Sequence, residues 1–418
     1  MKEMNGHERY LAALRCEEVD KLPSHWHGPE PAGMFRKEFD AYLDVDDNPE
    51  LDACFEIGPL GDITMKNWFS RGTSSDIGIG AGGISWQTVY YNTEKDWFYT
   101  HEEARKLPAS KKNFQITMHG SVRQYGYLLG KEGERPAKYW WFIKHFFEGP
   151  DALERRNAFY NEFGCPWEQE FDPDAPSIEQ AKKNIKLWLD YGAPHAYSGS
   201  CPFHFEGVWG GLGPTTLTKL ARKNPSTLKK ICKQWEKVTL TVEKYGLEAG
   251  HQIIATGDDL GQKDRSLVSP KMYDEFFFPA LKARCDLAHK HGAVVWMHSC
   301  GYQEELIPCY LKAGLDGLQS LEVPAGNDLA RIRATVRDKM CLIGGLDTSR
   351  VFTFGTSEES VAHVRDQIKA ATTLDGEFMN TGYIPGGAHD LLDVKLDNIQ
   401  AAIKAIAKYG KCPLKDNF

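Results

Sequence analysis

Apolar and polar segments alternate regularly along the second half of the chain. Short apolar runs are separated by longer stretches with helical periodicity, which is typical of parallel strands covered by helices. We expect strands at residues 195–201, 252–257, 293–298, 317–320, 340–344 and 377–381. We expect helices at residues 226–249, 269–291, 304–313, 358–373 and 393–409. This alternation predicts an α/β fold, either a closed barrel or an open doubly wound sheet.

The first half of the chain is less regular. Residues 86–91 have the aromatic and β-branched content of a strand, and the densely aromatic residues 139–147 are interpreted as a core helix rather than a substrate wall. Residues 78–83 match G-x-G-x-x-G, but a dinucleotide site needs a strand before this motif and a helix after it. Loop-like sequence precedes the motif and strand-like sequence comes after it, so we interpret it as a flexible loop.

We predict one domain over residues 1–418, because no internal repeat or low-complexity linker divides the chain. Residues 1–194 would form an irregular half with insertions, and residues 195–410 would form the regular strand–helix units.

Polar residues follow each predicted strand. A (β/α)8 barrel builds its active site from the C-terminal ends of all its strands, whereas an open sheet binds ligands at one switch point. Six successive polar strand ends therefore favour a (β/α)8 TIM-type barrel with an elaborated N-terminal half. The residues are Cys201, His204 and Glu206; Asp258 and Asp259; His298 and Cys300; Gln319 and Glu322; Asp347; and His389.

The segment His298-Ser299-Cys300-Gly301 carries a candidate metal motif. In a strand, residues i and i+2 point to the same side, so the imidazole and the thiolate can converge on one ion. Both are good ligands for zinc. The alternative interpretation is a buried histidine beside an unreactive cysteine.

Composition narrows the class of protein. The chain has 418 residues, of which 41% are hydrophobic and 26% charged, and a mean hydropathy of −0.47. These values are typical of a globular protein, and the absence of an 18-residue apolar run argues against a membrane span. The polar first residues do not resemble a secretory signal, and the ten cysteines include no C-x-x-C pair, so we expect a cytoplasmic protein with reduced thiols. A net charge of −8 without a long basic run gives no support to nucleic-acid binding.

Several motifs, taken in order and spacing, resemble the uroporphyrinogen decarboxylase superfamily, and especially its corrinoid-dependent methyltransferase branch. The resemblance is firm from about residue 195 to 408, thin at the N-terminus and absent from roughly 30 to 140, and it implies a (β/α)8 barrel. The motifs are residues 8–14 with 20–23, Gly257-Asp258-Asp259-Leu260-Gly261, Ser269-Pro270, His298-Ser299-Cys300-Gly301, Gly314-Leu315-Asp316 with Gln319, Gly344-Gly345-Leu346-Asp347, residues 355–359, and Asp397-Asn398.

The chain departs from both branches of this superfamily. The decarboxylases open with an arginine-rich loop that binds the propionates of the porphyrinogen, but no arginine occurs here between Arg15 and Arg36. Porphyrinogen decarboxylation is therefore not expected. Thiol-methylating members complete their H-x-C zinc site with a cysteine near the last strand, but residues 382–389 contain none and Cys412 lies beyond the final helix.

The third metal ligand thus stays open among His389, Glu206 and Asp258, in that order of suitability for zinc. With fewer thiolates the metal is more electrophilic, which suits activation of a methyl donor better than activation of a thiol.

The resemblance implies a methyltransferase that moves a methyl group from a small methoxylated or N-methylated donor to the corrinoid of a small partner protein, with zinc as the Lewis acid. The expected residues are His298 and Cys300 for the metal; Asp258, Asp259 and Gln319 for catalysis; and Glu206, Asp347 and His389 for substrate binding. Each has a structural alternative, since the aspartates can cap helices or turns and Gln319 can satisfy buried backbone groups.

Two other functions remain open. One is a decarboxylase-like enzyme acting on a non-porphyrin acid, and the other is a non-catalytic barrel that binds a tetrapyrrole. The joint presence of His298, Cys300, Asp258 and Asp259 argues against a mere scaffold. The identity of the donor, the physiological acceptor and the assembly state, for which a homodimer is the commonest form, are left open.

Overall fold

We describe the protein from a computed structural model. It describes residues 3–26, 53–54, 77–79, 85–108, 111–128, 137–190, 192, 196, 198–200, 203–389, 391 and 394–418. Among these residues, no helix combines the length and apolar character that crossing a bilayer requires.

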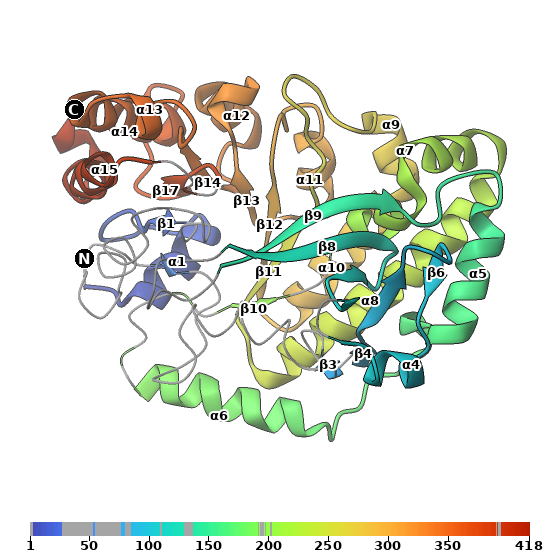
Figure 1. The fold of residues 1–418 in the computed structure, drawn as a ribbon. Coiled ribbons are helices and arrows are strands. Elements are labelled where there is room, and N and C mark those ends of the chain that lie inside the picture. The colour runs from blue at the N-terminus through green and yellow to red at the C-terminus, as the bar shows by residue number, and fades with distance from the viewer. Residues whose placement is uncertain are drawn as a thin grey trace.

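Eight parallel strands form the central sheet, in the order β10-β11-β12-β13-β14-β17-β1-β2 (Figure 1). This is the order of a TIM-type barrel, since the strands follow the chain around the sheet and β1 pairs with the last strand, β17. The strands are β1 (His25–Trp26), β2 (Ala53–Cys54), β10 (Gly199–Ser200), β11 (Ile253–Gly257), β12 (Val294–Ser299), β13 (Gly317–Ser320), β14 (Cys341–Leu346) and β17 (Tyr383–Gly387).

Helices cover the barrel strands in the second half of the chain. They are α7 (Phe205–Lys223), α8 (Pro225–Ala249), α9 (Pro270–Phe276), α10 (Phe278–Lys290), α11 (Ile307–Ala313), α12 (Leu329–Val336), α13 (Val351–Phe354), α14 (Ser357–Thr372) and α15 (Leu396–Tyr409). Among the described residues of the first half, the helices are α1 (Gly6–Leu14), α4 (His101–Arg105), α5 (Ala152–Phe163) and α6 (Pro176–Asp190).

The last barrel strand is not the one predicted from the sequence. Residues 377–378 form β16 (Glu377–Phe378), which pairs with β15 (Thr373–Leu374) in a small antiparallel hairpin after α14. The barrel strand is β17, whose Pro385, Gly386 and Gly387 have poor strand propensity. A Cβ atom on Gly386 would lie 1.7 Å from the carbonyl oxygen of His25, so close packing against β1 requires glycine there.

Two helix predictions also need correction. The long helix expected over residues 269–291 is divided at Phe277 into α9 and α10, because Pro279 cannot donate a hydrogen bond to the preceding turn. The helix α7 was missed, since its many glycines and Pro214 give it low helix propensity.

A second sheet is inserted between β2 and β10. It is antiparallel and contains β5 (Val89–Asn92), β6 (Trp97–Phe98), β7 (Phe114–Ile116), β8 (Ser121–Leu128) and β9 (Ala137–His145) in the order β6-β5-β7-β8-β9. A short pair, β3 (Ile77–Ile79) and β4 (Ser85–Gln87), precedes it. Residues 86–91, predicted as one strand, belong to two strands, β4 and β5, with a break at Thr88. The core helix predicted at 139–147 is wrong, because that aromatic segment pairs with β8 as β9.

The glycine-rich residues 78–83 begin within β3, and residues 80–84 lie outside the described residues. The next described element is the strand β4, whereas a dinucleotide motif requires a helix at that place.

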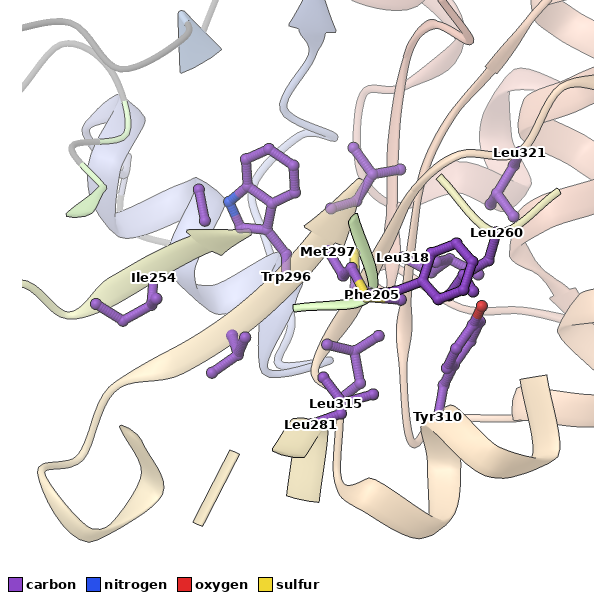
Figure 2. Close-up of a cluster of buried hydrophobic side chains, with 14 of the residues drawn as sticks. Phe205, Ile254, Leu260, Leu281, Trp296, Met297, Tyr310, Leu315, Leu318 and Leu321 are labelled. Atoms are coloured by element: carbon purple, nitrogen blue, oxygen red, sulfur yellow. The ribbon is translucent and has the colours of Figure 1, made fainter. Parts of the chain in front are cut away.

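The outer core of the barrel is apolar, as Figure 2 shows for the side chains around Met297 and Leu318. Met297 and Leu318 are paired in register on β12 and β13, and both are buried with Leu281 of α10 and Leu315. Strand alternation points Trp296 and His298 to the other side of β12, toward the barrel interior. The Trp296 and His25 rings meet there edge to face, with 5.2 Å between ring centroids.

A buried ion pair joins the helix layer to β11. Arg284 of α10 and Glu243 of α8 lie 2.9 Å apart, with side chains exposed by 1% and 0%. The Arg284 guanidinium also donates to the hydroxyl of Thr256 on β11, at 2.8 Å. Burial raises the pKa of Glu243, and the charge of Arg284 acts against that increase.

Replacing Glu243 by Leu leaves the charge of Arg284 buried without its partner. We expect Glu243→Leu to lower the free energy of unfolding by about 3–5 kcal/mol, measured by urea denaturation. The control is Asp286→Ala, which breaks the exposed Lys282–Asp286 pair on α10, the helix that carries Arg284. It is expected to lower the free energy of unfolding by less than about 1 kcal/mol. Equal losses in the two variants would contradict a structural role for the buried pair.

Candidate functional site

His298 lies at the C-terminal end of β12, where two hydrogen-bonding partners orient its ring. Its Nδ1–H donates to Oε1 of Gln319, which occupies the paired position on β13. Because an amide oxygen can only accept, Nδ1 is the donor in this contact, and Nε2 is the ring nitrogen that faces the neighbouring groups. Nε2 lies 3.3 Å from Oδ1 of Asp259.

Cys300 comes two residues later, in a loop held by buried polar groups. Gln303 donates from Nε2 to the carbonyl oxygen of Cys300 at 2.6 Å, and Glu322 accepts from the backbone N–H of Gly301 at 2.8 Å. Gly301 has φ +75°, and a Cβ atom on Gly261 would lie 2.3 Å from the carbonyl oxygen of Cys300. The two glycines therefore let the β11 and β12 loops touch and fix the position of Cys300.

His389 reaches the same place from the other side of the barrel mouth, two residues after β17. The segment before it is tied to β13, because the hydroxyl of Ser320 donates to the carbonyl oxygen of Ala388 at 2.7 Å. The ligand atoms of His298, Cys300 and His389 all lie within 4.8 Å of one another. The structure thus brings both residues of the H-x-C motif together with His389, which ranked first among the possible third ligands.

The adjacent carboxylates Asp258 and Asp259 have opposite environments. Burial raises the pKa of Asp258 to about 7, although backbone N–H groups of Phe205 and Glu206 counteract it. Burial also acts to raise the pKa of Asp259, but hydrogen bonds from His298 and Cys300 outweigh it and bring the pKa to about 2. At neutral pH, Asp259 is therefore ionised beside the cluster, whereas Asp258 exists in both forms.

Asp258 also has the capping role that the sequence left open. Its Oδ1 accepts from the backbone N–H of Glu206 at 3.1 Å, at the N-terminus of α7. This contact places the Glu206 side chain next to Asp258 and Asp259. Burial, followed by the charges of Asp259 and Asp258, raises the pKa of Glu206 to about 8. Glu206 is therefore protonated at neutral pH and able to donate a proton.

The electrostatic environment of Cys300 favours a cation. Burial and the nearby charge of Asp259 raise the pKa of the Cys300 thiol well above its usual range. Below the cluster, burial lowers the pKa of His25 to about 3, and the proximity of His298 adds to the effect. His25 is thus neutral, and its Nδ1 is hydrogen-bonded to the Tyr10 hydroxyl at 2.7 Å.

Asp347 is engaged in the turn after β14. Its Oδ1 accepts from the backbone N–H groups of Ser349 and Arg350 at 3.0 and 2.9 Å. These bonds correspond to the capping alternative, and the substrate-binding role of Asp347 stays a prediction. His204 is buried and bonded to the carbonyl oxygen of Cys232, and Cys201 lies outside the described residues.

Sequence reasoning missed the residues that hold the loops, namely Gln303, Asn327 and Ser320. Asn327 donates to the carbonyl oxygens of Gly301 and Glu322, at 2.9 and 2.8 Å. None of the three belongs to a motif with a recognisable spacing, so only their contacts reveal them. The role of Glu206 as a protonated group was also missed, because it depends on burial and on two neighbouring carboxylates.

The fold as a whole resembles that of a methyltransferase from Methanosarcina mazei. The TM-score is 0.54 at 15% identity, over 97% of this chain and 99% of that chain, which shows a shared fold. A B12-independent methionine synthase from Shewanella sp. W3-18-1 is also similar, at 16% identity over 57% of this chain and 65% of that chain. Its TM-score of 0.34 is too low to support an argument. No curated protein matches the chain in sequence.

Residues 208–409 match the sequence profile of the family described as uroporphyrinogen decarboxylase (URO-D). This region contains β11 to β17 and their helices, together with seven of the eight residues expected to form the site, and Glu206 lies just before it. The match extends over nearly the same residues as the resemblance seen in the sequence. The chain therefore carries a uroporphyrinogen decarboxylase (URO-D) family domain over residues 208–409, within a TIM-type barrel.

Proposed function

We propose that this protein is a methyltransferase that takes a methyl group from a small methoxylated or N-methylated donor and passes it to the corrinoid of a small partner protein. The observation that carries the proposal is the convergence of His298, Cys300 and His389 at the barrel mouth. The URO-D family domain and the fold shared with a methyltransferase support the same class of reaction.

The three converging residues suit zinc. Two imidazole nitrogens and one thiolate are common zinc ligands, and three protein ligands leave a fourth position for substrate. Ligand atoms around tetrahedral zinc lie about 3.3–3.8 Å apart, so the cluster needs only small side-chain movements to close. When bound, zinc would supply a Lewis acid that polarises the bond between the methyl group and its leaving atom.

The protein's own groups prepare the site for bond cleavage. Gln319 engages Nδ1 of His298 and so leaves Nε2 as the nitrogen that can bind a metal, and Asp259 supplies a negative charge beside the cluster. Glu206, supported by Asp258, holds a proton close by. This arrangement suits a step that stabilises a leaving group, in which alignment and charge matter more than proton abstraction.

In the proposed transfer, one bond to the methyl carbon breaks and another forms. The bond between the methyl carbon and the donor's oxygen or nitrogen breaks, and its electron pair stays on that atom. The proton from Glu206 neutralises the leaving group. The methyl carbon accepts the electron pair of the reduced corrinoid, which is the nucleophile that the partner protein supplies.

Metal analysis tests the ligand set. We expect about one zinc per purified chain, and a loss of most of it in Cys300→Ala and in His389→Ala, because each removes one of three ligands. His389→Cys replaces one ligand by another and is expected to retain zinc. Elemental analysis of the dialysed proteins gives the stoichiometry.

The matched control is Cys412→Ala, which removes a partly buried thiol from the C-terminal segment. It is expected to keep the full zinc content. Zinc-free wild-type protein after growth and purification with zinc, or unchanged zinc in Cys300→Ala, would rule out this site.

Gln319 is expected to set metal affinity without touching the metal. Gln319→Leu removes the acceptor for Nδ1–H and lets the His298 ring turn, so zinc affinity should fall about 10–100-fold. Gln319→Glu keeps an acceptor and should stay much closer to wild type. Competition with a chromophoric chelator measures both, and circular dichroism checks the fold. Wild-type affinity in Gln319→Leu would show that the bond has no positioning role.

The reaction itself is tested with cob(I)alamin and a panel of aryl methyl ethers and methylamines. We expect methylcobalamin to form with at least one donor, as followed by its absorbance. Chelation should abolish the reaction and added zinc should restore it, whereas Cys300→Ala should stay inactive. If zinc-loaded wild type forms no methylcobalamin with any donor in either class, the methyl-transfer proposal is wrong.

A further inference from the structure

One face of the inserted sheet lies against the start of α7, next to the proposed site. The Ser121 hydroxyl of β8 and the His145 ring of β9 both donate to the carbonyl oxygen of Gly210, at 2.9 and 2.7 Å. The His145 ring also packs on Trp209, with 4.8 Å between ring centroids. These contacts fix how the sheet lies along the helix.

A β-bulge extends this face beyond the helix contact. Ser121 pairs with His145 and Arg123 pairs with Phe142, so the register skips Ile143 on β9. Without the extra residue, Phe142 and His145 would point to opposite faces, because they are three positions apart. Their ring centroids instead lie 4.6 Å apart, so Phe142 and Arg123 share the face that meets α7.

Arg123 reaches the level of Glu206 in the barrel mouth. From Ser121 to Arg123 the strand advances about 6.8 Å, and from Gly210 back to Glu206 the helix spans about 6 Å. Arg123 and Glu206 therefore lie at about the same distance from the Ser121–Gly210 contact, one on the strand and one on the helix. In agreement, the charge of Arg123 lowers the pKa of Glu206 against the larger effect of burial.

Two large apolar side chains are exposed near these elements, Phe142 opposite Arg123 on β9 and Phe203 at the end of β11. Phe142 is 47% exposed and Phe203 is 44% exposed, although both lie next to buried elements. Phe203 Cε1 lies 2.6 Å from the point where a Cβ atom on Gly257 would stand, and the Cβ of His298 lies 3.4 Å from the same point. The Phe203 ring thus covers the end of β11, beside the first metal ligand.

We propose that Arg123, Phe142 and Phe203 form a specificity wall that selects methyl donors with a flat apolar body and a carboxylate remote from the methyl group. The proposal rests on the function proposed above and names the class of donor for the same site. The methyl group would lie toward His298, the flat body against the phenyl rings, and the carboxylate on the guanidinium of Arg123.

Each side chain has the chemistry needed to bind its part of such a donor. A guanidinium presents parallel N–H donors that bind a carboxylate through two hydrogen bonds, and it keeps its charge at any physiological pH. Phenyl rings bind flat apolar groups by stacking and edge contacts. An anionic donor also needs a cation at this entrance, because the Asp259 carboxylate beside His298 would otherwise repel it.

Three probes of similar shape and different charge distinguish the effect of charge on binding from the effect of shape. They are 3-methoxybenzoate, 3-methoxybenzyl alcohol and 3-methoxybenzylamine, which are anionic, neutral and cationic. Calorimetry of each with the zinc-loaded full-length protein gives affinities that do not depend on turnover. We expect the wild type to bind the anion at least tenfold more tightly than the other two.

Arg123→Gln should weaken binding of the benzoate about tenfold or more and leave the alcohol within about twofold. Arg123→Lys keeps the charge but loses the parallel N–H donors of the guanidinium, so its affinity for the benzoate should be intermediate. The matched control is Lys144→Gln in the neighbouring strand. Lys144 lies on the opposite face, paired with Asp96, and its loss should change neither affinity.

The wall is ruled out if wild type shows no preference for the benzoate, or if Arg123→Gln weakens the benzoate and the alcohol equally. It is also ruled out if Lys144→Gln has the same effect as Arg123→Gln. Failure of the proposed function looks different. In that case the benzoate binds in an Arg123-dependent way, but no methyl group passes from it to cob(I)alamin.

Discussion

The site depends on the in-register parallel pairing of β11, β12 and β13. This pairing sets Gly257, His298 and Gln319 side by side, so that three strands end at one level. The amide of Gln319 can then reach Nδ1 of His298, and Asp259 and Cys300 lie within two residues of the ends of their strands. A shift of one residue in either ladder would turn His298 away from its partners, because strand side chains alternate between the two faces. The buried packing around Met297 and Leu318 opposes that shift.

Sequence patterns predicted the elements of the barrel well where the strands are continuous apolar runs. The strands at β11, β12, β13 and β14 and the helices α8, α14 and α15 were found to within a few residues. The failures have local causes. In β17 the chain uses Pro385 and Gly386, whose propensities argue against a strand, because contact with β1 leaves no room for a side chain. In β9 the aromatic run forms a strand because it pairs with β8 along its whole length. Tertiary contacts outweigh intrinsic propensity in both segments.

The candidate site was predictable in residue type more than in arrangement. The H-x-C motif named two residues of the cluster, and zinc chemistry ranked His389 as the third. The division of labour between neighbouring carboxylates was not readable, since it depends on which oxygen caps α7 and which lies beside His298. Arg123 was beyond reach, because its position depends on the packing of β8 against α7, a contact between segments far apart in the sequence.

The pairing of β1 with β17 joins segments about 360 residues apart in the sequence. During synthesis, β1 is made long before β17, so the nascent sheet keeps open edges until β17 has left the ribosome. Its long-range contacts also make closure slow compared with helix formation. Open parallel edges invite pairing with other chains, and the inserted sheet, whose contacts are more local, can form meanwhile. Production of this protein should therefore depend on chaperones and growth temperature more than its many buried contacts suggest.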